Sequence, residues 1–177
     1  MSELKVNSIK GVSASSAAIS INNTDGTCTA NLTNRTNKNL VINGDFRIAQ
    51  RATSSTTSGI ATVDTFGMYH TGVDEAPTQA QGSVTSGGAY DSGFRNCLKV
   101  TNGNQTSGGG SAKYIWIQSL FEAQDIANSG WNYTSTSSFI TVQFWVKSSV
   151  AQNFYGYVRT VDGSNYLYPF ETGSLSA

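Results

Sequence analysis

The chain contains a single histidine, His70, and any catalytic chemistry that depends on an imidazole must use it. A Ser-His-Asp arrangement would take its carboxylate from the nearby Asp64 or Asp74 and its nucleophile from one of many serines. However, no G-x-S-x-G elbow or comparable context surrounds a serine. We therefore interpret His70 as a strand-end residue, packed or exposed, without a catalytic role.

Two acids three residues apart, Glu122 and Asp125, are the candidate pair for glycoside hydrolysis. That reaction needs two carboxyl groups held roughly 5 to 9.5 Å apart across a cleft, whereas acids at this spacing usually lie on the solvated face of a helix. The glycine tract Gly108–Gly110 lacks the Lys-Ser/Thr pair and the following helix of a phosphate-binding loop, so it is interpreted as a linker. These residues predict a protein that is not an enzyme and needs no cofactor.

Metal-ligand residues are few and scattered. Cys28 and Cys97 have no C-x-x-C spacing, and the single histidine cannot complete a zinc site, so both cysteines are predicted to be free thiols. Structural Ca²⁺ sites in β-sandwiches use carboxylates and backbone carbonyls, and Asp45 is the natural candidate here. One carboxylate does not make a site, so no metal centre is predicted.

Four tyrosines repeat at period two on two late segments, and they are the candidate residues for ligand binding. Tyr155 and Tyr157 share one side of a predicted strand, and Tyr166 and Tyr168 share one side of the next. An exposed row of tyrosines can stack sugar rings, because the ring face is apolar and the hydroxyl bonds at its edge. The alternative, which is favoured, is that one of the rows lines the core or a subunit interface.

The composition narrows the class of protein that could contain these residues. Lys+Arg and Asp+Glu both number 11, so nothing attracts nucleic acid or an anionic membrane surface. No segment is apolar enough to span a membrane, and the N-terminus lacks the apolar region of a signal peptide. Charged residues make up 12% and aromatics 11%, which indicates a β protein whose outer faces carry Ser and Thr.

Residues 1–38 contain no aromatic residue, so they cannot supply an ordinary globular core. They nevertheless alternate like strands around a Thr24-Asp25-Gly26 turn signal. Such short runs do not form a stable hairpin alone in water, whereas three copies around a threefold axis would share one interior. Residues 1–38 are therefore expected either to stay disordered or to take their core from other chains. In the second case they form a trimeric stem through Leu4, Val6, Ile9, Ile19, Ile21 and Leu32.

Residues 39–177 are predicted to form one antiparallel, jelly-roll-like β-sandwich. Strands are expected at 39–43, 45–50, 60–70, 97–101, 113–120 and 139–149, with a hairpin of 153–161 and 165–170 around Asp162-Gly163-Ser164-Asn165. One short helix is expected within 119–129. A jelly roll normally uses about eight strands, and several of the strands expected here are weak. Either the sandwich is therefore incomplete at the C-terminus, or the sequence is the front part of a longer polypeptide.

The segment KNLVINGDFRIAQRATSSTTSGIATVDTF resembles an opening found in bacteriophage tail-fibre and other virion structural proteins, notably of marine and cyanobacterial phages. The matching elements are Asn39–Ser54 and Val63–Phe66, and the later IWIQSLFEAQDIA and ITVQFWVKSS resemble a companion pair in those proteins. These companion segments also resemble the sandwich of carbohydrate-binding modules. The resemblance covers about residues 39–150. Asp64-Thr65-Phe66 departs from it, because an aspartate followed by a basic residue and tryptophan is commoner there.

The resemblance implies a non-enzymatic, homotrimeric virion component, assembled in the host cytoplasm and located in the phage tail. Its N-terminus would attach to tail adaptor or nozzle proteins, and the rest would support host recognition and adsorption. One alternative is a carbohydrate-binding module that contacts host-surface polysaccharide directly. Another is an accessory capsid or head fibre built from the same parts.

Overall fold

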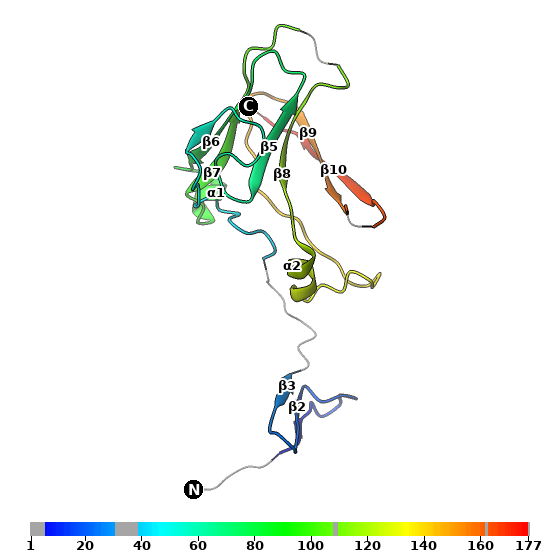
Figure 1. The fold of residues 1–177 in the computed structure, drawn as a ribbon. Helices are drawn as coiled ribbons and strands as arrows, with labels where there is room; N and C mark the ends of the chain where they lie inside the picture. The colour runs from blue at the N-terminus through cyan, green and yellow to red at the C-terminus, as the bar shows by residue number, and fades with distance from the viewer. Residues whose placement is uncertain (1–5, 31–38, 108–109, 162, 177) are drawn as a thin grey trace. The chain divides into compact units, whose positions relative to one another are not determined.

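The computed structural model of the chain describes residues 6–30, 39–107, 110–161 and 163–176 (Figure 1). Strands make up 30% of these residues and helices 6%, and the small sheets are antiparallel, so the predicted all-β class is confirmed. The backbone contacts divide the chain into two compact units, Met1–Ile140 and Thr141–Ala177. The predicted stem residues Leu4 and Leu32 lie outside the described residues.

The first sheet is a three-stranded meander of β1 (Ser8–Ile9), β2 (Ile19–Ile21) and β3 (Cys28–Ala30). The hairpin of β2 and β3 is the one that the alternating residues predicted. Asp25 closes its turn, because its carboxylate accepts hydrogen bonds from the backbone N–H and the hydroxyl of Thr27, at 2.9 and 2.7 Å. The local turn chemistry is therefore sufficient to explain this hairpin.

The second sheet has the order β4-β6-β7, with β4 at Ser54–Ser55, β6 at Thr78–Ser83 and β7 at Asn96–Thr101. A short helix, α1 (Gly88–Asp91), lies between β6 and β7. The strand predicted at 97–101 is confirmed by β7. Neither β6 nor α1 was predicted, because their residues are mostly small or polar and carry no clear apolar period.

The third sheet pairs β5 (Phe66–Thr71) with β8 (Tyr114–Ser119), and α2 (Ala123–Asn128) follows β8. The predicted strand within 113–120 and the predicted short helix are both confirmed. The strand predicted at 60–70 begins only at Phe66. The preceding residues form bends and turns that enter the core instead.

That core centres on the loop before β5. Val63 and Met68 are fully buried, and so is the amide side chain of Gln79 on β6. The amide nitrogen of Gln79 donates to the backbone carbonyls of Thr57 and Gly59, at 2.7 and 2.9 Å, and its oxygen accepts the Thr62 hydroxyl at 3.1 Å. A buried amide with its hydrogen bonds satisfied thus ties the irregular 57–62 segment to the second sheet.

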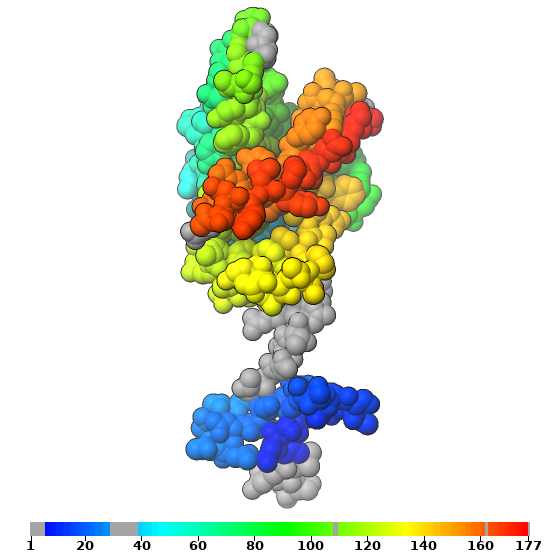
Figure 2. All heavy atoms as spheres, turned by 90° about the vertical axis from the view of Figure 1, so that its right-hand side faces the viewer, coloured from blue at the N-terminus to red at the C-terminus, as the bar shows by residue number. Residues whose placement is uncertain are grey.

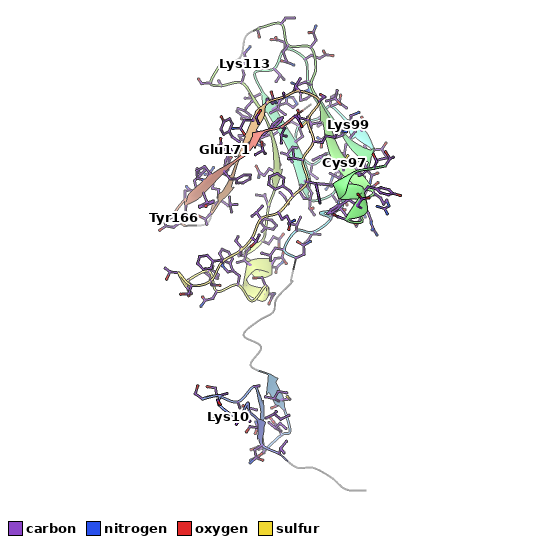
Figure 3. The ribbon with its side chains drawn as sticks, turned by 180° about the vertical axis from the view of Figure 1, so that it is seen from behind. Lys10, Cys97, Lys99, Lys113, Tyr166 and Glu171 are labelled. Atoms are coloured by element: carbon purple, nitrogen blue, oxygen red, sulfur yellow. The ribbon has the colours of Figure 1, made fainter. Side chains whose placement is uncertain are left out.

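The second unit contains a hairpin of β9 (Asn153–Arg159) and β10 (Leu167–Ser174), which confirms the predicted pairing. Figure 3 labels Tyr166 and Glu171 on it. Thr160 stabilises the turn: its hydroxyl donates to the carbonyl of Ser164 and accepts the N–H of Tyr166, both at 2.8 Å. Asp162, part of the predicted turn, lies outside the described residues.

Three predicted strands are wrong. Residues 39–43 and 45–50 form turns and loop rather than strands, because side-chain hydrogen bonds fix a compact bend there. Residues 139–149, whose alternation predicted a strand, contain none. Within this fully described stretch, residues 139–147 take part in no backbone–backbone hydrogen bond.

Candidate functional site

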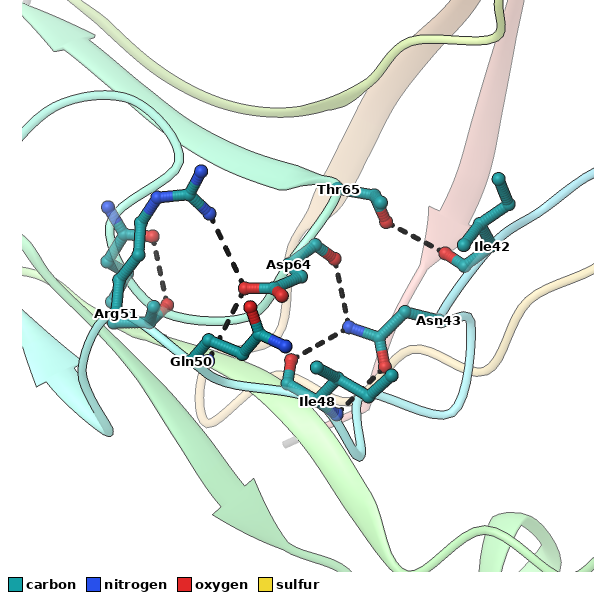
Figure 4. Close-up of polar contacts among 9 residues, drawn as sticks. Ile42, Asn43, Ile48, Gln50, Arg51, Asp64 and Thr65 are labelled. Atoms are coloured by element: carbon teal, nitrogen blue, oxygen red, sulfur yellow. Dashed lines mark hydrogen bonds and ion pairs between the residues drawn. The ribbon is translucent and has the colours of Figure 1, made fainter.

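The segment that carries the resemblance, residues 39–54 with 63–66, forms a hydrogen-bonded loop cluster (Figure 4). The Asn43 amide nitrogen donates to the carbonyls of Ile48 and Asp64, both at 2.9 Å, and its oxygen accepts the N–H of Ile48 at 3.0 Å. Asn43 has φ 56°, a left-handed conformation that asparagine tolerates better than most residues. Asn43 therefore has a structural role: its side chain and its backbone conformation both stabilise the bend.

Asp64 continues the same cluster. Its carboxylate accepts the N–H of Gln50 and contacts the guanidinium of Arg51, both at 3.4 Å, and its N–H bonds the carbonyl of Ile48 at 2.9 Å. Next to it, the hydroxyl of Thr65 donates to the carbonyl of Ile42 at 2.8 Å. The Asn, Gln-Arg and Asp elements of the motif thus bond one another and fix the loop cluster.

The two tyrosine pairs of the hairpin lie on opposite faces of it. Tyr155 pairs with Glu171 and Tyr157 with Pro169 across the ladder, whereas Tyr168 pairs with Val158. Directly paired residues share a face and neighbours along a strand alternate, so Tyr168 lies on the other face. Tyr166, two residues earlier, follows the side of Tyr168. The four tyrosines therefore do not form a single stacking platform.

The face that contains Tyr155 and Tyr157 is the open one. The two residues are 81% and 50% exposed. The other paired residues of this face are exposed as well: Arg159, Leu167, Pro169 and Glu171. Figure 2 shows the hairpin atoms, orange to red, at the surface. Glu171 supplies a carboxylate beside the rings, where its oxygen accepts the amide of Asn153 at 2.7 Å.

The opposite face carries the local packing of the second unit. The ring of Phe170 lies over Gly156, its directly paired neighbour, and occupies the position that a Cβ there would need. Phe144 approaches the same ring, with centroids 5.8 Å apart. Tyr166 and Tyr168 lie beyond this small cluster and are 72% and 74% exposed. Both rows are thus exposed in the single chain.

The described stem residues form an apolar stripe without a core. Ile9 pairs directly with Ile19, and Ile21 lies two residues farther along the same face of the meander. Ile9 is 53% exposed and Val6 36%, and Ile19 and Ile21 are only half-buried. Among residues 6–28, no side chain is buried.

The catalytic candidates are not brought together. His70 lies in β5 opposite Ile115, and its Nε2 atom is buried with no hydrogen-bond partner among the described residues. Asp64 bonds the Gln50 and Arg51 groups, and Asp74 bonds a different loop at Thr106 and Ser107. His70 is therefore not poised by a carboxylate to activate a nucleophile.

The two acids proposed for glycoside hydrolysis flank the start of α2. Glu122 precedes the helix, and its carboxylate accepts the amide of Gln124 at 2.7 Å. Asp125 lines a small pocket with apolar neighbours, and Glu122 is not part of that lining. The pair therefore does not face one shared cleft.

The remaining candidates for ion binding are engaged locally. The carboxylate of Asp45 forms an ion pair with Arg47 at 2.6 Å. Gly108 and Gly109 lie outside the described residues, and the carbonyl of Gly110 accepts the N–H of Lys113 at 2.9 Å. Over the described ranges, no cluster of three or more His, Cys, Asp or Glu residues could hold a metal ion, and no helix is long and apolar enough to cross a membrane.

An aromatic row on the third sheet is a feature that the sequence reasoning did not single out. Tyr69 and Trp116 are directly paired across β5 and β8, with ring centroids 6.2 Å apart. Tyr114 stacks on Trp116 at 4.4 Å with an interplanar angle of 6°. The alternation of Tyr114 and Trp116 along the sequence places both rings on one face of the strand. Their pairing with Tyr69 depends on the register between β5 and β8, which the sequence does not show.

A second unpredicted feature is a loop clamp at the end of this row. The Asp74 carboxylate accepts the N–H of Thr106 at 2.7 Å and both the N–H and the hydroxyl of Ser107, at 2.6 and 2.5 Å. These bonds from Ser107 hold the pKa of the Asp74 carboxyl well below its usual range. The clamp joins the loop after β5 to the loop after β7.

Comparison of the chain with protein-family models, with curated proteins and with solved structures finds no match.

Proposed function

We propose that the protein is a structural component of a phage virion, the N-terminal part of a homotrimeric tail fibre. In this proposal residues 1–38 attach the fibre to tail adaptor or nozzle proteins, and the following β-rich part supports adsorption to the host. The observation that carries the proposal is the partly exposed stripe of Ile9, Ile19 and Ile21, in a segment whose residues 6–28 bury no side chain.

The physical argument is that such a meander is too small to be stable alone. The three strands have only two or three residues each. Their apolar stripe stays partly open to water, because Ile9 is 53% exposed and Ile19 and Ile21 are half-buried. A threefold axis would bring three copies of the stripe together and remove this surface from water, which stabilises association. The resemblance of residues 39–66 to fibre openings supports the same assembly and gives it a virion setting.

The experiment is to measure the mass of the assembled particle in solution. Light scattering after gel filtration is expected to give three times the 18.8 kDa of the single chain. Ile19→Asp combined with Ile21→Asp places charges on the stripe and should give monomers. Ser20→Asp is the matched control, because Ser20 pairs with Ser8 on the opposite face of the meander. A monomeric wild type, or a trimer unaffected by the double variant, would contradict trimerisation through the stem.

The virion assignment needs its own test. Antibodies raised against residues 1–38 are expected to bind free fibres. They should fail to bind intact particles, because the attachment surface is covered in the assembled particle. Antibodies against residues 153–174 should label the tail in electron micrographs. Labelling of the capsid instead would favour an accessory head fibre.

We further propose that the small sheets of residues 39–177 belong to one jelly-roll-like sandwich. The antiparallel pairing in each of these sheets supports this assignment. Scanning calorimetry tests it, because one sandwich should unfold in a single cooperative transition. Two separate transitions would contradict a single sandwich.

A second candidate function is a carbohydrate-binding module that contacts host-surface polysaccharide directly. The open face of β9 and β10 favours it, because Tyr155 and Tyr157 are exposed side by side with Arg159 and Glu171 as hydrogen-bonding neighbours. Tyr166 and Tyr168 would not join that platform. Loss of glycan binding on Tyr155→Ala, with retention on Tyr168→Ala, is the expected result for this function.

A further inference from the structure

The aromatic row of Tyr69, Trp116 and Tyr114 ends at an open pocket, and the last ring forms part of its wall. One face of Tyr114 is covered by Trp116 in the parallel stack. Tyr114 as a whole remains 40% exposed and lines the pocket together with Gln105, Ser107 and Lys113. An exposed aromatic face beside polar side chains is thus available at this end of the sheet.

The polar side chains of the pocket are held in place by the loop clamp. Lys113 donates to the Ser107 hydroxyl, which in turn donates to Asp74. The Gln105 amide donates to the carbonyl of Glu75 at 2.8 Å and accepts the N–H of Asp74 at 2.9 Å. Each amide and ammonium group keeps unused hydrogen-bonding capacity, because Lys has three donors and the Gln amide has two donors and two acceptor sites.

The missing side chain of Gly72 leaves room for the side chain of Lys113. Gly72 has φ +63°, and a Cβ there would lie 2.9 Å from the Cγ atom of Lys113. The lysine side chain therefore lies against the loop after β5, close to the aromatic wall. Figure 3 labels Lys113 at this loop end of the molecule. Groups fixed in advance in this way lose less conformational entropy when a ligand binds.

We propose that this pocket binds one pyranose unit of a neutral glycan, with the apolar face of the sugar on Tyr114 and its hydroxyls bonded by Gln105 and Lys113. The site differs from the tyrosines of β9 and β10 and does not depend on the virion role. Its volume is about 200 Å³, below the roughly 300 to 1,000 Å³ of pockets that enclose drug-sized ligands. It therefore suits a single ring, with the rest of the glycan in solvent.

Charge favours a neutral sugar over an anionic ligand. Among the described residues that line the pocket, Lys113 is the only charged one. The Asp74 carboxylate lies nearby, because it accepts the hydroxyl of Ser107, which also lines the pocket. The two charges interact, since Lys113 also lowers the pKa of Asp74. With equal numbers of acidic and basic residues in the whole chain, nothing adds a field that would attract a phosphate backbone.

The test is calorimetric titration of the full chain with cellohexaose, laminarihexaose, maltohexaose and chitohexaose, and with a single-stranded deoxythymidine oligonucleotide as the competing class. At least one hexasaccharide should bind. Tyr114→Ala should weaken that binding about tenfold or more, as for removal of a central aromatic contact. Tyr114→Phe keeps the ring and should leave the affinity nearly unchanged.

Three further variants complete the design. Tyr155→Ala tests the other candidate surface, because loss of binding in this variant alone would place the sugar on β9 and β10. Tyr133→Ala is the matched control and should bind like the wild type, because Tyr133 is 64% exposed and does not line the pocket. Lys113→Ala removes a hydrogen-bond donor to the sugar hydroxyls and should weaken binding several-fold. This variant tests the pocket if Tyr114→Ala fails to fold. Four results would each overturn the proposal: no hexasaccharide binds, only the oligonucleotide binds, neither pocket variant weakens binding, or the loss occurs only in Tyr155→Ala. The stem is intact in every variant. The particle mass measured on the same samples therefore tests trimerisation separately from glycan binding by the pocket.

Discussion

The side-chain amide of Asn43 donates to the backbone carbonyl of Asp64, 21 residues farther along the chain, at 2.9 Å. This bond joins the two parts of the segment that resembles fibre openings. The same amide also bonds both backbone groups of Ile48, so one side chain fixes the bend and its contact with the loop before β5.

Asn43→Ala should therefore destabilise the protein. The variant loses three hydrogen bonds and places alanine at φ 56°, so we expect the free energy of unfolding to fall by about 2–4 kcal/mol. Urea denaturation measures the change. Asn39→Ala is the control, because among the described residues the Asn39 side chain bonds only the N–H of Val41, and it should cost less than about 1 kcal/mol. Equal effects of the two variants would contradict the role of Asn43.

Gly156 should not tolerate a side chain while Phe170 is present. Because the ring occupies the position of the missing Cβ, Gly156→Ala is expected to lower stability by about 1–3 kcal/mol through overpacking. Adding Phe170→Leu to that variant should recover part of the loss, which a thermal melt can detect. At Gly110, where a Cβ would have no atom within 4 Å, the same change to alanine should be nearly neutral.

The loop clamp predicts a specific acid sensitivity. Hydrogen bonds from Ser107 depress the pKa of Asp74 in the folded state below its ordinary value of 3.8. The clamp therefore adds stability above pH 3.8, and this contribution is lost as the pH falls toward the folded-state value. Melting temperatures recorded from neutral pH into acid should fall more steeply for the wild type than for Asp74→Asn. Parallel curves would show that the clamp does not affect folding.

The register of β9 and β10 can be tested with a metal. Arg159 and Leu167 are directly paired and exposed, so Arg159→His with Leu167→His places two imidazoles on one face, within reach of one Ni²⁺. Nickel should raise the melting temperature of this variant, because it binds the folded state. Arg159→His with Tyr168→His places the imidazoles on opposite faces and should show no such rise. The reverse result would move Tyr168 onto the face of Tyr155 and Tyr157.

The sequence by itself determined the elements whose information is local. Asp25-Gly26 and the isoleucines around it were enough for the hairpin of β2 and β3, because the turn is closed by residues two positions apart. The alternation of Tyr114, Trp116 and Gln118 was enough for β8, and the turn before Tyr166 was enough for the β9–β10 pairing. The all-β class follows from the same short-range patterns.

Tertiary structure decided what depends on distant partners. The apolar alternation of 40–48 predicted strands, but side-chain hydrogen bonds from Asn43 bend this segment into a loop against Asp64. The residues of β6 are mostly small or polar, so their pattern did not predict a strand. Gln79 is buried in this strand because its amide bonds the carbonyls of Thr57 and Gly59, which are distant in the sequence. The faces of the tyrosines, and the row of Tyr69, Trp116 and Tyr114, follow from strand register, since a shift of one residue exchanges the two faces of a sheet.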